Sequence, residues 1–209
     1  MPLWGSFLKA HSTVEIELWK ERYYEKKKQA AESDDQKAVE FNMKLESLSR
    51  VFDGLPVKLH AHQADDIATA MRIKREFNLN MTIEHCTEGY LIADALKENN
   101  QMVIIGPTMH NKSKYELKQK SFDSGRILYE NGVLFSIMTD HPVIEQKHTL
   151  VQLALFVKEG LDELDALKAV TINAAKLNHI DENMYKKYID FLKEKYTNIK
   201  KSSQDKNEQ

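Results

Sequence analysis

The distribution of hydrophobic residues changes character at Pro56. Between residues 12 and 52 the apolar positions recur at helical spacing, which predicts two helices. The clearer of the two has a stripe at i, i+4, i+7 and i+11, formed by Phe41, Leu45, Leu48 and Phe52. After Pro56 short apolar runs alternate with amphipathic segments, and the runs begin every ~20 to 30 residues, a spacing typical of strand–helix–strand units.

Four apolar runs in this second part are the predicted strands, at residues 57–59, 81–83, 102–105 and 133–138. The runs are continuous rather than alternating, which indicates a parallel sheet buried on both faces. Helical stripes lie between and after them, among them Ile67/Ala70/Ile73/Phe77 and Leu150/Leu153/Ala154/Val157. A last helical pair is expected near Leu164/Leu167 and Met184/Tyr188/Phe191, before a polar tail. The predicted fold class is α/β, with about four parallel βα units.

The composition narrows the range of partners. Lys and Arg together number 30 and Asp and Glu 32, so the formal net charge of -2 provides no overall field to attract nucleic acid or an anionic membrane. Cys86 is the single cysteine, which excludes an internal disulfide framework and favours a reducing, cytoplasmic setting. No apolar run approaches the ~20 residues that a membrane span requires. A small-molecule substrate is the expected partner.

Residues that can bind a metal stand at the ends of three predicted strands. The first strand runs into His60 and His62, the second into His85, and the fourth into Asp140 and His141. Because the carboxyl ends of parallel strands meet at one edge of a sheet, these side chains are expected to meet there. Imidazole nitrogens and a carboxylate suit Zn²⁺ and related divalent ions.

From this group we select His60, His85 and Asp140 as the candidate metal ligands. The simpler interpretation of a lone histidine is a hydrogen-bonded structural residue, and it is the expectation for four others, His62, His110, His148 and His179. Cys86 is expected to be a small buried residue, because nothing beside it in the sequence indicates a lowered thiol pKa.

Four segments together resemble one family of enzymes. They are the run VKLHAHQADDIATAMRIKREFNLNMTIEHCTEGYLIADAL, the strand VIIGP, the segment GVLFSIMTDHPV and the helical ALKAVTINAAKLNHI. The ordered combination of HxH, IEH and TDHP resembles the metal-dependent amidohydrolase superfamily, with the imidazolonepropionase-like and prolidase-like branch as the nearest match. The resemblance extends over roughly residues 55 to 180.

The resemblance implies a part of a TIM-type (β/α)8 barrel and a hydrolase that uses one or two divalent metals, with zinc expected. His60 is then a metal ligand that ends the fifth barrel strand, and His85 is a ligand or transition-state stabiliser that ends the sixth. Asp140, after the eighth strand, contacts metal and takes a proton from the attacking water. The implied catalytic residues are Asp140 and His85, and the implied metal ligands are His60, His85 and Asp140.

The first-strand HxH pair and the bridging carboxylate of the fourth strand have no counterpart before Pro56. We therefore divide the chain into a helical lead segment (residues 1–54), a partial barrel (55–180) and a C-terminal helix with a disordered tail (181–209). The leading hypothesis is an amidohydrolase-related hydrolase of amide, cyclic amide or dipeptide C–N bonds. It is expected to be a truncated chain with weak activity or none on its own.

Two other functions remain open. The first is a noncatalytic half-barrel whose exposed sheet edges pair with a second copy of the chain or with a complementing N-terminal chain. The second is a self-sufficient α/β binding domain in which His60 and His85 are only structural.

Overall fold

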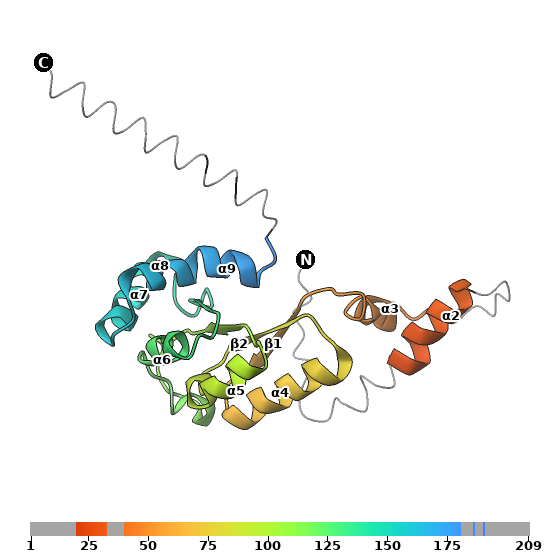
Figure 1. Cartoon of the computed structure of the whole chain (residues 1–209), viewed down its shortest axis with the longest axis horizontal. Helices are drawn as coiled ribbons and strands as arrows, with labels where there is room; N and C mark the ends of the chain where they lie inside the picture. The colour runs from red at the N-terminus through yellow and green to blue at the C-terminus, as the bar shows by residue number, and fades with distance from the viewer. Residues whose placement is uncertain (1–19, 33–39, 181–185, 187–189, 191–209) are drawn as a thin grey trace, which may run out of the picture.

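The computed structural model describes residues 20–32 and 40–180, together with residues 186 and 190. This part of the chain forms a four-stranded parallel sheet with helices around it (Figure 1). The strands are β1 (Val57–Ala61), β2 (Met81–His85), β3 (Val103–Ile105) and β4 (Phe135–Ile137). The α-helices are α2 (Lys26–Glu32), α3 (Met43–Ser49), α4 (Ala64–Phe77), α5 (Ala93–Glu98), α6 (Ser124–Glu130), α7 (Thr149–Lys158), α8 (Glu163–Val170) and α9 (Ile172–Leu177). Short helical turns are Lys20–Glu25, Gly89–Ile92, Tyr115–Leu117 and Gln146–His148.

The strands lie in chain order, and each pairs in parallel with the next. Ile83 of β2 stands opposite Leu59 on one side and Val103 on the other, and Val103 in turn faces Phe135. Every residue of β2, β3 and β4 is buried, as the continuous apolar runs predicted. Successive βα units in this order are a segment of a TIM-type barrel, so the predicted α/β fold class and partial barrel are confirmed.

Helix α4 packs against β1 and β2 through the predicted stripe. Ile67, Ala70, Ile73 and Phe77 are all buried in the core. The helix ends at Asn78, whose φ of 50° turns the chain out of the helix while its backbone N–H caps the last carbonyls. Helical periodicity therefore identified both the element and the face that it buries.

The stripes predicted for α7 and α8 are wrong in detail. In α7 the buried side chains are Gln152, Leu153 and Phe156, whereas Leu150 is 67% exposed. In α8 the buried residues are alanines, Ala166 and Ala169, while Leu164 and Leu167 are exposed. Small side chains let a helix approach the sheet closely, and α8 contacts β4 directly, so packing distance rather than hydrophobicity decided which face turned inward.

Helix α3, before the sheet, is shorter than predicted. Asn42 caps α3 by accepting hydrogen bonds from the backbone N–H groups of residues 44 and 45. Phe41 therefore precedes the helix and is 71% exposed, and Phe52 lies beyond its end. Glu46 of α3 pairs with Lys27 of α2 and accepts a hydrogen bond at 2.9 Å from the hydroxyl of Tyr23, which lies in the turn Lys20–Glu25. Most of the first predicted helix and the stripe Met184/Tyr188/Phe191 lie outside the described residues.

Both edges of the sheet are open within the described part of the chain. There β1 pairs only with β2, and β4 only with β3. In that same part, the helices are too short or too polar to cross a lipid bilayer.

Candidate functional site

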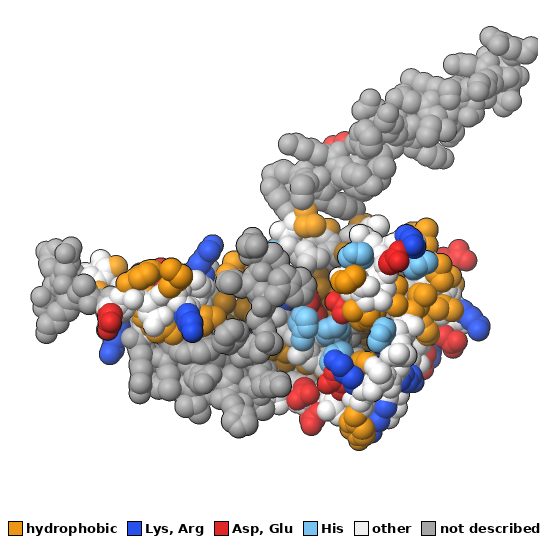
Figure 2. Space-filling view, turned by 180° about the vertical axis from the view of Figure 1, so that it is seen from behind, with side chains coloured by type: hydrophobic (Ala, Val, Ile, Leu, Met, Phe, Trp, Pro, Cys, Tyr) orange, Lys and Arg blue, Asp and Glu red, His pale blue; other side chains and the backbone are white. Residues whose placement is uncertain are grey.

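The three selected residues line a single cavity of about 270 Å³ at the carboxyl edge of the sheet. His60 lies in β1, His85 is the last residue of β2, and Asp140 follows β4 by three residues. His85 and Asp140 have φ angles of 67° and 51°, so the chain turns sharply where each side chain enters the cavity. Figure 2 shows histidine side chains gathered on one face of the molecule, beside acidic and basic groups. His141, in contrast, is exposed and does not line the cavity.

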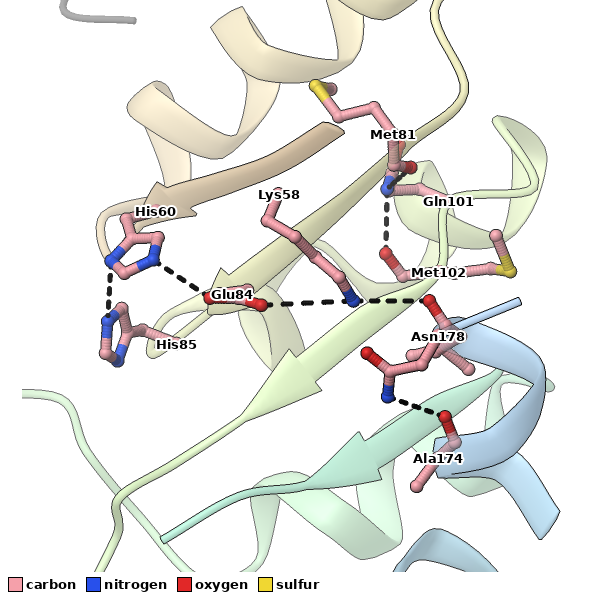
Figure 3. A network of polar contacts seen from close by, with 10 residues as sticks. Lys58, His60, Met81, Glu84, His85, Gln101, Met102, Ala174 and Asn178 are labelled. Atoms are coloured by element: carbon pink, nitrogen blue, oxygen red, sulfur yellow. Dashed lines mark hydrogen bonds and ion pairs between the residues drawn. The ribbon is translucent and has the colours of Figure 1, made fainter. Parts of the chain in front are cut away.

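His60 and His85 face each other through their ring nitrogens. The distance between His60 Nδ1 and His85 Nε2 is 3.1 Å, and the rings meet edge to face with centroids 4.8 Å apart (Figure 3). On its other side His85 Nδ1 donates a hydrogen bond to the Gly106 carbonyl at 2.9 Å. Burial lowers the pKa of His85, because its charged form is poorly solvated there.

The outer nitrogen of His60 is held by a buried carboxylate. His60 Nε2 lies 2.9 Å from Glu84 Oε2, and the Glu84 side chain is only 9% exposed. The other oxygen of Glu84 is 3.9 Å from Lys58 Nζ, which also donates a hydrogen bond to the Leu177 carbonyl at 3.2 Å. Burial lowers the pKa of Lys58, and the Glu84 carboxylate opposes that shift.

His62, expected to be only a structural residue, lines the same cavity. Its ring stacks on that of His85 with centroids 4.5 Å apart, and its Nδ1 lies 2.8 Å from the Thr87 hydroxyl. Burial lowers the pKa of His62 to about 4, so the ring is neutral near pH 7. The HxH spacing places His60 and His62 two residues apart, which in an extended chain puts both side chains on one side, and both rings line the cavity.

The other predicted structural histidines fall into two groups. His110 also lines the cavity, from the loop that follows β3. His148 and His179 are exposed and are not among the lining residues.

The loop after β3 is held in place by buried polar contacts. Gly106 has a φ of 122°, and a Cβ atom there would lie 2.2 Å from the Met138 carbonyl oxygen, so the close approach of the two segments requires glycine. Gln152 of α7 joins the same segments, because its amide donates to the Met138 carbonyl and its Oε1 accepts from the Thr108 N–H. Lys120, which is also buried, donates to backbone carbonyls of the loop, including that of Pro107.

Comparison with solved structures relates this arrangement to a known enzyme class. The chain matches the crystal structure of an amidohydrolase from Thermotoga maritima MSB8 with 38% sequence identity and a TM-score of 0.73 over 79% of its own length. The chain is amidohydrolase-like. It spans 44% of the length of that structure. No protein-family model and no curated protein matches it.

The amidohydrolase-like site offers a divalent metal only part of a ligand set. Two imidazole nitrogens that bind one tetrahedral zinc at ~2.05 Å would lie ~3.3 Å apart, close to the 3.1 Å between His60 Nδ1 and His85 Nε2. Among the described residues, however, no three His, Cys, Asp or Glu side chains converge closely enough to hold a metal ion. The two rings therefore fit two positions of a metal site, with Asp140 on the wall of the same cavity.

Sequence reasoning missed Glu84, Gly106 and His62 as parts of this site. A charged residue within an apolar strand was the available signal for Glu84. The role of Gly106 depends on a close approach to Met138, which is 32 residues away in the chain and which local sequence does not reveal.

Proposed function

We propose that this chain supplies part of the site of a metal-dependent hydrolase that acts on amide, cyclic amide or dipeptide C–N bonds. The observation that supports the proposal is the contact between His60 Nδ1 and His85 Nε2 inside the cavity that Asp140 also lines. Both outer ring nitrogens face oxygen acceptors, which leaves the two inner nitrogens free of protons when the rings are neutral. Two such nitrogens, 3.1 Å apart, are suited to bind one cation that lies beside the line joining them.

In this proposal His60 Nδ1 is a metal ligand, and His85 either binds the metal through Nε2 or, with that nitrogen protonated, polarises the scissile carbonyl. The Asp140 carboxylate is a further ligand, accepts a proton from the attacking water and returns it to the leaving amine. A bound Zn²⁺ would supply Lewis acidity and a lowered pKa for its water. The stack of His62 on His85 and the hydrogen bond to Gly106 keep the His85 ring in one orientation.

Zinc affinity of the full chain tests this ligand assignment. With two converged donors and Asp140, zinc should bind weakly, and His60→Asn or His85→Asn should each raise the Kd by about tenfold or more. A competition titration against a chromophoric chelator measures these values. His148→Asn, which changes an exposed imidazole outside the cavity, is the matched control and should leave the Kd unchanged. Equal zinc binding by all four proteins would refute the assignment.

Hydrolysis assays test the activity. Acyl-proline dipeptides and cyclic amides should be hydrolysed negligibly by the chain alone, because the site lacks a full ligand set among the described residues. Tight stoichiometric zinc with turnover that Asp140→Asn abolishes would contradict this expectation and show a self-sufficient enzyme.

The open sheet edges favour a second candidate function, assembly into a larger barrel. Because β1 and β4 each pair on one side only in the described part of the chain, either edge is available to a second copy or to a complementing N-terminal chain. Light scattering combined with size-exclusion chromatography measures the mass in solution. A strict monomer with one cooperative thermal transition counts against obligate self-pairing.

A further inference from the structure

Glu84 occupies an unusual position for a carboxylate. It is the penultimate residue of a fully buried strand, with a side chain that is 9% exposed, and it stands opposite His60 in the β1–β2 register. A buried carboxylate is costly unless it is paired and hydrogen-bonded. Both of its oxygens do face partners, since Oε2 contacts His60 Nε2 and Oε1 faces Lys58 Nζ (Figure 3).

These contacts determine which nitrogen of His60 carries the proton. A carboxylate only accepts hydrogen bonds, so His60 Nε2 at 2.9 Å from Glu84 must be the N–H donor. In the neutral ring Nδ1 then carries a lone pair, and it lies 3.1 Å from His85 Nε2. The other tautomer would place the lone pair of Nε2 against the full negative charge of the Glu84 carboxylate, which is less favourable than a lone pair that faces the neutral His85 ring.

Lys58 connects Glu84 to a distant element of the fold. Its Nζ donates to the carbonyl of Leu177, the last residue of α9, and faces Glu84 at 3.9 Å. Carbonyls at the carboxyl end of a helix carry partial negative charge, which favours a cation there. A line of polar contacts therefore runs from α9 through Lys58 and Glu84 to His60 (Figure 3).

We propose that Glu84 is a positioning residue that holds His60 in its Nε2–H tautomer, and that Lys58, anchored to the end of α9, holds the Glu84 carboxylate in place. In this tautomer the lone pair of His60 is on Nδ1, the nitrogen that faces His85 in the cavity. This role rests on the proposed function only where metal binding is concerned. The tautomer itself is a property of the chain without metal.

Nitrogen-15 NMR of the imidazole rings in the metal-free full chain tests the tautomer directly. In the wild-type chain, at a pH where the ring is neutral, His60 should be in the Nε2–H form. Glu84→Ala removes the acceptor and should give a mixture of tautomers. Glu84→Gln should retain the Nε2–H form, because the amide oxygen accepts the same hydrogen bond.

Two control variants, Glu116→Gln and Lys74→Met, separate the positioning role from general effects of removing a charge or a partly buried side chain. Glu116→Gln alters a carboxylate 3.8 Å from His62 Nε2 and should leave the His60 tautomer unchanged. Lys58→Met should weaken the preference, whereas Lys74→Met should not. Lys74 is an apt control because it too is partly buried and donates to a backbone carbonyl, that of Asn100. Circular dichroism establishes that each variant is folded.

Zinc titration of the same variants gives the second measurement. Loss of a partner that orients a metal-binding histidine typically costs 10–100-fold in affinity, so Glu84→Ala should raise the Kd by about that factor and Glu84→Gln by less. A folded Glu84→Ala chain that keeps His60 entirely as the Nε2–H form would overturn the positioning role. If the tautomer shifts but no variant or wild-type chain binds zinc, the positioning role stands and the proposed metal site fails.

Discussion

Gly106→Ala is the substitution whose effect on the site the structure defines most sharply. A methyl group at this position would lie 2.2 Å from the Met138 carbonyl oxygen, a backbone atom that cannot rotate away. The φ of 122° is also a conformation that residues with a Cβ rarely adopt. Relief of the clash must separate the β3 loop from the end of β4 and so displace the Gly106 carbonyl, which accepts the hydrogen bond of His85 Nδ1.

Gly54→Ala provides the matched control, because it separates backbone strain from steric overlap. Gly54 has a similar positive φ of 94°, but a Cβ there meets nothing within 4 Å. Positive φ costs a residue with a side chain about 1–2 kcal/mol, and the reduced entropy of the unfolded chain offsets part of this, leaving about 1 kcal/mol for Gly54→Ala. Overpacking adds about 1–3 kcal/mol at Gly106, for a total of about 2–4 kcal/mol.

Urea unfolding followed by far-UV circular dichroism measures both losses. With an m-value of about 2 kcal/mol/M, the midpoint should fall by about 1–2 M for Gly106→Ala and by about 0.5 M for Gly54→Ala. The His85 imidazole resonances should move in the first variant only. Equal midpoints for the two variants, with His85 unchanged, would refute the close approach of Gly106 to Met138.

Two other predictions concern buried groups. Gln152→Leu should lower the free energy of unfolding by about 2–4 kcal/mol, because it leaves the buried Thr108 N–H without its acceptor and removes a donor from the Met138 carbonyl. A loss below about 1 kcal/mol, measured by urea unfolding, would contradict this prediction. Cys86 is 1% exposed and burial raises its pKa to about 12, so a thiol reagent at pH 7 should modify the native chain about a hundredfold or more slowly than the chain in denaturant. Comparable rates in the two conditions would show that the thiol is accessible in the native state.

The candidate site was predictable from sequence in part. His60, His85 and Asp140 were selected because they end apolar runs, and the parallel sheet brings all three to one cavity, though their roles as ligands stay a prediction. His62 was predicted to be only a structural residue, because a lone histidine is most often structural. The stacking of its ring on that of His85, a residue of the neighbouring strand, is a tertiary contact that the local sequence does not reveal.

Periodicity along the chain was enough to identify the α/β class, the four parallel strands and the buried face of α4, because alternation between strand and helix is a local property of hydrophobic spacing. The spacing of hydrophobic residues did not predict which side chains are buried where this depends on the distance between two elements. Helix α8 buries Ala166 and Ala169 rather than its leucines because it lies close to β4. The pairings of Glu84 with His60 and of Lys58 with Leu177 join residues 24 and 119 positions apart. Such contacts arise only when the chain has folded, since hydrogen bonding and electrostatics act over a few ångströms of space whatever the separation in sequence.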